Sequence, residues 1–211
     1  MKVKKISLII LILISIMTLT VYKNNRILLA SNKKQFFVEI MQDGKEITVR
    51  GHQVSLKKSP FTLIVYFEEK SDANILVNAS LSPDSFESAQ KGKSIDEIAG
   101  FKETGMAEES MNENRYLMIS KCAPHYWYYK NRKDHRFNGI TEMNGELKCR
   151  RTVEKIMLRD TTREYVDIEK IDQNEIYFVF MKAKWNKDFT KKTEVQRDYL
   201  KIKFVKENKK G

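Results

Sequence analysis

Segment 122–137, CAPHYWYYKNRKDHRF, gathers the residue types of this chain that could carry out chemistry. It contains one of the 2 cysteines and two of the 3 histidines, beside a block of aromatic residues and a run of arginines and lysines. Cys122 and His125 could form a nucleophile–base pair. On a strand, however, residues three apart point to opposite faces, unless Pro124 bends the chain between them. We therefore do not expect a cysteine hydrolase.

The two cysteines, Cys122 and Cys149, are predicted to form a disulfide, as an even pair does in an exported protein. On the loop-entropy model such a bond stabilises the fold by about 3 kcal/mol. The alternative is a zinc site that adds His125 and His135 to the two cysteines. The spacing of these residues does not follow the paired pattern of structural zinc sites. We expect no metal and no other cofactor.

The aromatic block followed by basic residues could form a binding surface, in which rings stack on a ligand and cations hold its phosphates or carboxylates. On a strand, Trp127 would share one face with His125 and Tyr129 and enter the core. Tyr126 and Tyr128 would lie half exposed on the other face. The candidate binding residues are therefore Tyr126, Tyr128, Lys130, Arg132, Lys133 and Arg136. The alternative is a purely structural aromatic strand that leads into a solvated turn.

The chain opens with a basic MKVKK, and residues 6–22, ISLIILILISIMTLTVY, then carry no charge. This order is typical of an export signal. As a helix the run would reach about 25 Å, at the short end of the range for membrane-spanning segments. It is either a cleaved signal peptide or a membrane anchor, whose lysines would keep the N-terminus in the cytoplasm. We expect an exported protein that is membrane-tethered, periplasmic or extracellular.

The length of the chain after this segment suits one domain. We expect residues 1–31 to be the signal or anchor with a short linker, and residues 32–211 to be a single exported β-rich domain. A hairpin is predicted around the Asp-Gly turn at 43–44. In that register Ile40 opposes Ile47, so that apolar residues meet on one face, and Val38 would oppose Val49.

Further strands follow from the same alternation of apolar and polar residues. An Asn-Gly turn at 144–145 predicts a second hairpin in which Ile140 opposes Cys149. Residues 61–69 form a strand with one apolar face. Two more strands are predicted near the C-terminus, at 174–185 and 198–206.

Two short helices, 83–91 and 95–103, are expected in the middle of the chain. Gly92 would end the first of them, and Ser94 and Glu97 have the spacing of a capping box at the start of the second. The predicted fold class is α+β. It consists mainly of antiparallel β-sheet, with two short helices in a central insertion, preceded by an N-terminal hydrophobic helix.

The formal net charge of +11 favours anionic partners. The charge is uneven, because residues 96–113 are rich in acids and the second half of the chain is basic. This separation suits a polar protein–protein contact as well as it suits nucleic acid. We expect an acidic protein or an anionic glycan as the partner, and we do not expect nucleic acid. The sequence contains none of the common catalytic motifs or glycine-rich phosphate loops. We expect a non-enzymatic cell-envelope protein that binds another protein or an anionic polymer through a basic and aromatic surface. An extracytoplasmic hydrolase of an unrecognised type is the alternative.

Overall fold

The structure is a computed structural model, and it describes residues 36–68, 73–98, 101, 116–120, 124–129, 135–159, 162–187 and 191–205. Contacts between Cα atoms divide the chain into two units, and Phe36–Gly211 is the unit that contains the described residues. The hydrophobic helix expected at residues 6–22 lies outside them. Within the described ranges, no helix has the length and apolar character needed to cross a membrane.

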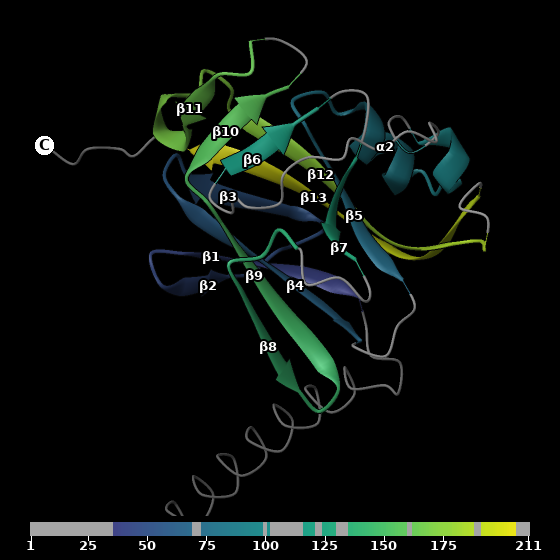
Figure 1. The fold of residues 1–211 in the computed structure, drawn as a ribbon. Coiled ribbons are helices and arrows are strands. Elements are labelled where there is room, and N and C mark those ends of the chain that lie inside the picture. The colour runs from purple at the N-terminus through teal and green to yellow at the C-terminus, as the bar shows by residue number, and fades with distance from the viewer. Residues whose placement is uncertain are drawn as a thin grey trace, which may run out of the picture. The chain divides into compact units, whose positions relative to one another are not determined.

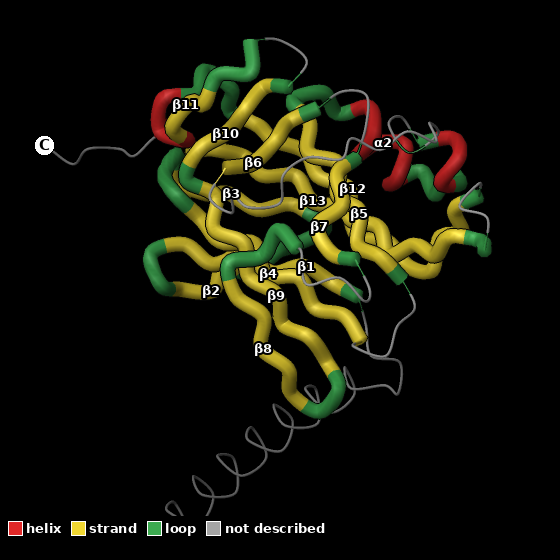
Figure 2. Tube along the Cα trace, in the orientation of Figure 1, coloured by secondary structure: helices red, strands yellow, loops and turns green. Residues whose placement is uncertain are grey.

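The described residues form three β-sheets (Figure 1), and among them strands dominate while helical turns are confined to short segments (Figure 2). Sheet A has the strand order β2 (Lys45–Ile47), β1 (Phe37–Gln42), β4 (Phe61–Glu68), β9 (Glu146–Val153) and β8 (Gly139–Met143). Sheet B has the order β3 (Gln53–Lys57), β13 (Lys192–Val205), β12 (Glu175–Trp185), β5 (Asn74–Ser80) and β7 (His125–Tyr128). Sheet C has the order β11 (Tyr165–Asp167), β10 (Lys155–Leu158) and β6 (Tyr116–Ile119).

Most neighbouring strands are antiparallel, but β13 pairs with β3 and β10 pairs with β6 in parallel. Only Glu154 separates β9 from β10, so one run of chain passes directly from sheet A into sheet C. On one side of the fold, side chains join the two larger sheets. Gln42 of β1 accepts a hydrogen bond from the backbone nitrogen of Lys57 of β3 at 3.0 Å and donates one to its carbonyl oxygen at 3.1 Å. These bonds satisfy backbone groups at the edge of β3.

The inward faces of sheets A and B, with parts of sheet C, share one hydrophobic cluster, here called the inner core. The alternation expected from sequence explains it, because every second residue of a strand points to the same face. Leu63 and Val65 of β4 enter it from sheet A, and Phe178 and Phe180 of β12 enter it from sheet B. Such burial is the main source of stability in a fold of this kind.

The outward face of sheet B carries a second cluster, here called the outer core. Val179 and Met181 of β12 form it together with residues of the central insertion, including Ala89 and Phe101. The central strand β12 is therefore apolar on both faces, as expected for a strand that is covered on both sides. The insertion lies over the right-hand part of sheet B in Figure 1.

The prediction of two helices, and with it the α+β class, is wrong, because the described fold is mostly β and contains one α-helix, α2 (Asp84–Gln90). Of the predicted second helix, 95–103, the structure describes residues 95–98 and 101, and there Ile95–Glu97 forms a 3-10 turn, η1, which is followed by Ile98 in extended backbone. Ser94 does make its capping contact, because its backbone nitrogen donates to Glu97 Oε2 at 3.0 Å. A capping box starts a turn, but it does not supply the apolar periodicity that extends one. A second 3-10 turn, η2 (Ile168–Lys170), was not predicted.

The two predicted hairpins are present in the expected registers. Ile40 opposes Ile47 in the first, and Ile140 opposes Cys149 in the second. The pairing of Val38 with Val49 is wrong, because β2 ends at Ile47 and its pairing with β1 does not extend beyond Ile40.

Candidate functional site

The aromatic segment forms β7 (His125–Tyr128), an edge strand of sheet B whose side chains enter both cores. Its pairing with β5 contains a register shift that leaves Trp127 without an opposite residue. Such a β-bulge turns consecutive side chains toward the same face. Trp127 lies in the inner core and Tyr128 packs against it. Tyr126 lies in the outer core, and Tyr129 packs against that core.

The expected division of this strand into two faces is therefore wrong. Strict alternation would place Tyr126 and Tyr128 on one face and Trp127 and Tyr129 on the other. With the bulge, Trp127 and Tyr128 face the inner core, and Tyr126 and Tyr129 face the outer core. The placement of Trp127 in the core is as predicted.

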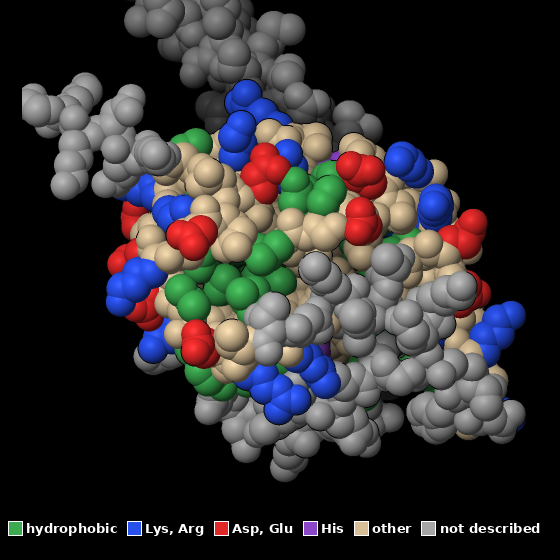
Figure 3. All heavy atoms as spheres, turned by 90° about the horizontal axis from the view of Figure 1, so that it is seen from above, with side chains coloured by type: hydrophobic (Ala, Val, Ile, Leu, Met, Phe, Trp, Pro, Cys, Tyr) green, Lys and Arg blue, Asp and Glu red, His purple; other side chains and the backbone are tan. Residues whose placement is uncertain are grey.

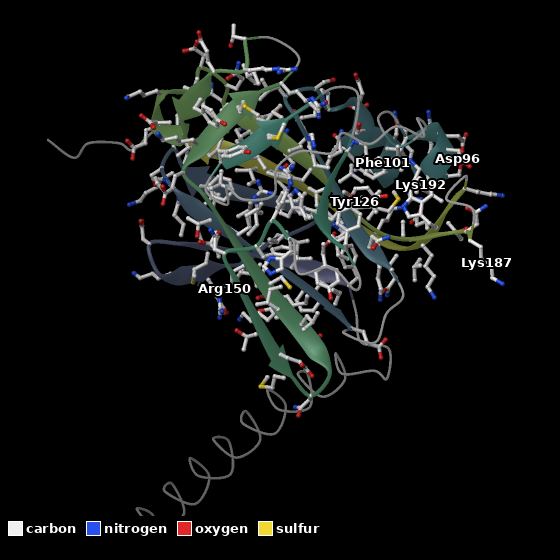
Figure 4. All side chains as sticks on the ribbon, in the orientation of Figure 1. Asp96, Phe101, Tyr126, Arg150, Lys187 and Lys192 are labelled. Carbon is white, nitrogen blue, oxygen red and sulfur yellow. The ribbon has the colours of Figure 1, made fainter. Side chains whose placement is uncertain are left out.

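The side chain of Tyr126 connects β7 to β12 in the outer core, to which Phe101 also belongs (Figure 4). Its hydroxyl oxygen accepts a hydrogen bond from the indole nitrogen of Trp185. Its ring stacks on the ring of Tyr129 at a centroid distance of 4.1 Å. Lys192 donates from Nζ to the carbonyl oxygen of Phe101 at 2.6 Å, and this Nζ lies 5.6 Å from the centre of the Trp185 ring. With 8% of its surface exposed, Tyr126 is a structural residue rather than part of an open surface.

The remaining candidate binding residues are not grouped on one surface by the described structure. Tyr128 is half-buried, and its ring lies edge-on to Phe67 at 4.9 Å. Arg136 is buried at 2% exposure, so it does not belong to an exposed basic turn. The other three candidates, Lys130, Arg132 and Lys133, lie outside the described residues.

Arg136 instead belongs to a group of basic side chains, here called the Arg–His cluster, in which His125, Arg136 and Arg151 are buried and Arg159 is partly buried. The group converges on β6. Arg151 donates from Nη2 to the carbonyl oxygen of Tyr116 at 2.5 Å, and Arg136 donates from Nη1 to the sulfur of Met118 at 3.4 Å. The backbone nitrogen of Arg159 donates to the carbonyl oxygen of Ile119 at 3.2 Å.

Arg151 is the most deeply buried member of the Arg–His cluster, with 0% of its surface exposed. It occupies an inward position of β9, on the same face as Cys149, and its guanidinium carbon lies 4.2 Å from the centre of the Trp127 ring. Within the part of the chain that the structure describes, its Nε and Nη1 atoms have no hydrogen-bond partner. Burial and the charge of Arg136 lower the pKa of Arg151 to about 9, so it remains a cation at neutral pH.

The charges of Arg136, Arg151 and Arg159 also act on His125. Burial lowers the pKa of His125 to about 3, with smaller contributions from Arg136, Arg159 and Arg151. Neither of its ring nitrogens has a hydrogen-bond partner among the described residues. At neutral pH the imidazole is therefore uncharged, and it offers one N–H donor and one acceptor.

This Arg–His cluster was missed by sequence reasoning, which treated Arg136 as part of an exposed turn. One signal was present, because alternation in the β9 sequence ELKCRRTV places Arg151 on the same face as Leu147, Cys149 and Val153. An arginine on an apolar face is a candidate for a buried cation. No comparable signal marks Arg159, which follows β10 directly.

Cys149 lies in the inner core with a free thiol and 0% exposure, and burial raises the pKa of that thiol to about 12. Cys122 lies outside the described residues, so the disulfide stays a prediction. His135 forms an isolated bridge with Tyr128. Among the described residues, no three His, Cys, Asp or Glu side chains are grouped to hold a metal ion.

Comparison of this chain with protein-family models, with curated proteins and with solved structures finds no match in any of the three.

Proposed function

We propose that this protein is a non-enzymatic binding protein of the cell envelope, which recognises an acidic protein or an anionic polymer through the surface next to β7. The observation that carries the proposal is the anchoring of β7. Trp127 and Tyr126 fix the strand in the two cores, and Tyr128 and Tyr129 are left half-buried beside them. This arrangement presents a rigid aromatic edge directly before the basic sequence 130–133. Rigid aromatic side chains bind with little loss of conformational entropy, and arginines add forked contacts to carboxylates or phosphates.

The proposed surface is more limited than the sequence suggests. Arg136 and Tyr126 hold the segment in place from inside, so the contacts with a partner come from Tyr128, Lys130, Arg132 and Lys133. Acidic and basic side chains are interspersed on the face seen from above in Figure 3, where sheet C lies. A mixed face of this kind does not favour an anionic partner at sheet C, and the proposal therefore assigns binding to the basic sequence 130–133.

A hydrolase is the less favoured function. His125 has a pKa near 3, which makes it a weak base at neutral pH, and burial keeps the Cys149 thiol protonated. A general base is most effective when its pKa lies near the working pH.

Export and tethering by residues 6–22 form part of the proposal. Cell fractionation with detection of the full-length chain tests them, and we expect the protein in the membrane or extracytoplasmic fraction. Full-length protein found free in the cytoplasm would contradict the export proposal.

Charge reversal tests the binding proposal, with heparin as a model anionic polymer. We expect Arg132→Glu/Lys133→Glu to weaken heparin binding several-fold at low salt and to reduce the steepness of its salt dependence. The matched control is Lys45→Glu/Lys187→Glu, which makes the same change of charge at two exposed lysines in other hairpins. Equal loss of binding in both double variants would mean that only net charge matters, and the surface next to β7 would be rejected. Melting temperatures of both variants should stay close to that of the unmodified protein.

A further inference from the structure

The Arg–His cluster is costly as a purely structural feature. Transfer of a charge into the interior is unfavourable unless other groups compensate it, and buried pairs or clusters can often be replaced by apolar side chains without loss of stability. The charged groups that lower the pKa of His125 are all arginines. Two groups act electrostatically on Arg151: Arg136 lowers its pKa and Tyr116 raises it. Arg136 and Arg151 therefore repel each other, and no carboxylate is among the groups that shift the pKa of Arg151.

Several N–H donors of Arg151 and His125 also make no hydrogen bond with the described residues. The Nη2 atom of Arg151 is engaged by Tyr116, while its Nε and Nη1 atoms lack a partner among the residues described. Both ring nitrogens of His125 likewise lack a hydrogen-bond partner among the described residues. Most buried polar groups in proteins are hydrogen-bonded, so buried donors without partners call for a specific explanation, such as a bound ion.

The types of donor define the ligand. Guanidinium groups present several N–H bonds in one plane, which matches the oxygen atoms of phosphate or carboxylate. The neutral imidazole of His125 adds one donor without adding charge. The Trp127 ring covers one face of the Arg151 guanidinium at 4.2 Å, so the free N–H bonds of that group lie in the plane at its edge.

We propose that the Arg–His cluster is the binding site for a small oxyanion, such as inorganic phosphate, which accepts hydrogen bonds from Arg151 and His125. The anion compensates the buried positive charge and satisfies the donors that the described residues leave unpaired. The site uses the buried residue His125 of β7 rather than the half-buried Tyr128 and the basic sequence 130–133, and it does not depend on the proposed binding of a macromolecular partner. The depth of Arg151 favours a small free anion over a phosphate group within a polymer.

Thermal unfolding in increasing inorganic phosphate tests the site, with chloride added to hold the ionic strength constant. We expect the melting temperature of the full chain to rise with phosphate concentration, as it does for any ligand that binds only the folded state. Arg151→Met should abolish this rise, and Arg151→Lys should reduce it because lysine lacks the planar fork. Without phosphate, Arg151→Met should be at least as stable as the unmodified protein.

Arg150 provides the matched control. It precedes Arg151 on β9 but points to the opposite face, where it donates to Thr141 Oγ1 at 3.4 Å, and it lies well apart from Tyr126 in Figure 4. Arg150→Met should keep the full response to phosphate. The proposal would be overturned if phosphate raised the melting temperature of Arg151→Met as much as that of the unmodified protein. It would also be overturned if phosphate did not raise the melting temperature of the unmodified protein. If the unmodified protein does not respond to phosphate, the variant Glu108→Gln/Glu109→Gln/Glu113→Gln can be tested in the same way. A phosphate response in that variant alone would identify the protein's own acidic segment as the occupant of the site.

A second measurement keeps the test valid if Arg151→Met does not fold. Nuclear magnetic resonance can follow the titration of His125, assigned with His125→Asn. A nearby anion favours the imidazolium, so phosphate should raise the pKa of His125 by a unit or more from its value of about 3. A His125 titration that is insensitive to phosphate would overturn the site independently of any arginine variant.

Discussion

The Arg151 guanidinium stacks on the Trp127 ring, with 4.2 Å between the guanidinium carbon and the ring centre, although the two residues lie on strands of different sheets. Trp127 is also held edge-on by Phe137 and Phe180, each with a centroid distance of 5.9 Å. One indole thus connects the buried cations to the inner core. A cation–aromatic contact of this kind is favourable by about 2 kcal/mol when it is shielded from water.

Replacement of Trp127 by alanine should lower the free energy of unfolding by about 3–5 kcal/mol, because it leaves a large cavity. The loss should exceed that for an ordinary core residue, since it also removes the ring that covers Arg151. Urea denaturation measures the change. Met143→Ala, at a side chain that is 70% exposed, is the control and should stay within about 0.5 kcal/mol of the unmodified protein. A cost below about 1 kcal/mol for Trp127→Ala would show that the indole is not part of the core.

The turn of the first hairpin depends on Gly44, whose φ angle is +72°. A side chain is strained in this left-handed conformation, so Gly44→Ala should destabilise the protein by about 1 kcal/mol. Gly139→Ala is the control. A Cβ atom meets nothing within 4 Å at either position, but only Gly44 has a left-handed φ angle. Thermal or urea unfolding compares the two variants, and equal effects would refute a role for turn conformation.

The predicted disulfide between Cys122 and Cys149 can be tested by counting thiols in protein isolated from the exported compartment. In denaturant without a reducing agent, a disulfide-bonded protein should not react with an alkylating reagent. After reduction, two alkyl groups should be added. Denaturation is required because Cys149 is fully buried, which protects a free thiol in the folded state as well. Two reactive thiols before reduction would exclude the bond.

Local sequence patterns were sufficient to predict the hairpins. The turns at 43–44 and 144–145 have residues that accept positive φ angles, and the flanking alternation then leaves one favourable register for each pair of strands. The inward face of β13, with Leu200 and Ile202, follows from the same alternation. These features depend on residues close together in the chain, so the sequence alone contains the necessary information.

The bulge in β7 could not be predicted, because it arises from pairing with β5, a strand distant in sequence that the alternation analysis did not identify. A single extra residue moves Tyr128 away from the face expected for it. The Arg–His cluster was missed for a similar reason. Arg151 lies on β9, whereas Arg136 precedes β8 and Arg159 follows β10, and their common contact with β6 brings them together.

The stability of the protein should fall in mild acid because His125 is buried as a neutral ring. Its pKa lies near 3 in the folded protein and near 6.5 in the unfolded chain, where burial and the three arginines no longer act on it. Between these values the unfolded chain binds one more proton than the folded protein. The contribution of His125 is thus complete above pH 6.5 and is lost as the pH falls toward 3, by about 1.4 kcal/mol for each pH unit.

Urea denaturation at several pH values between 7 and 4, in buffers without phosphate, measures this dependence. Carboxylates also titrate in the lower part of this range, so the informative quantity is the difference between the unmodified protein and His125→Gln. The variant should lose stability less steeply between pH 6.5 and 5, where histidine is the main titrating group. His52→Gln, at an exposed histidine, should retain the steep dependence. If His125→Gln and the unmodified protein show the same slope, His125 is accessible to protons in the folded state, and the buried position assigned to the Arg–His cluster is incorrect.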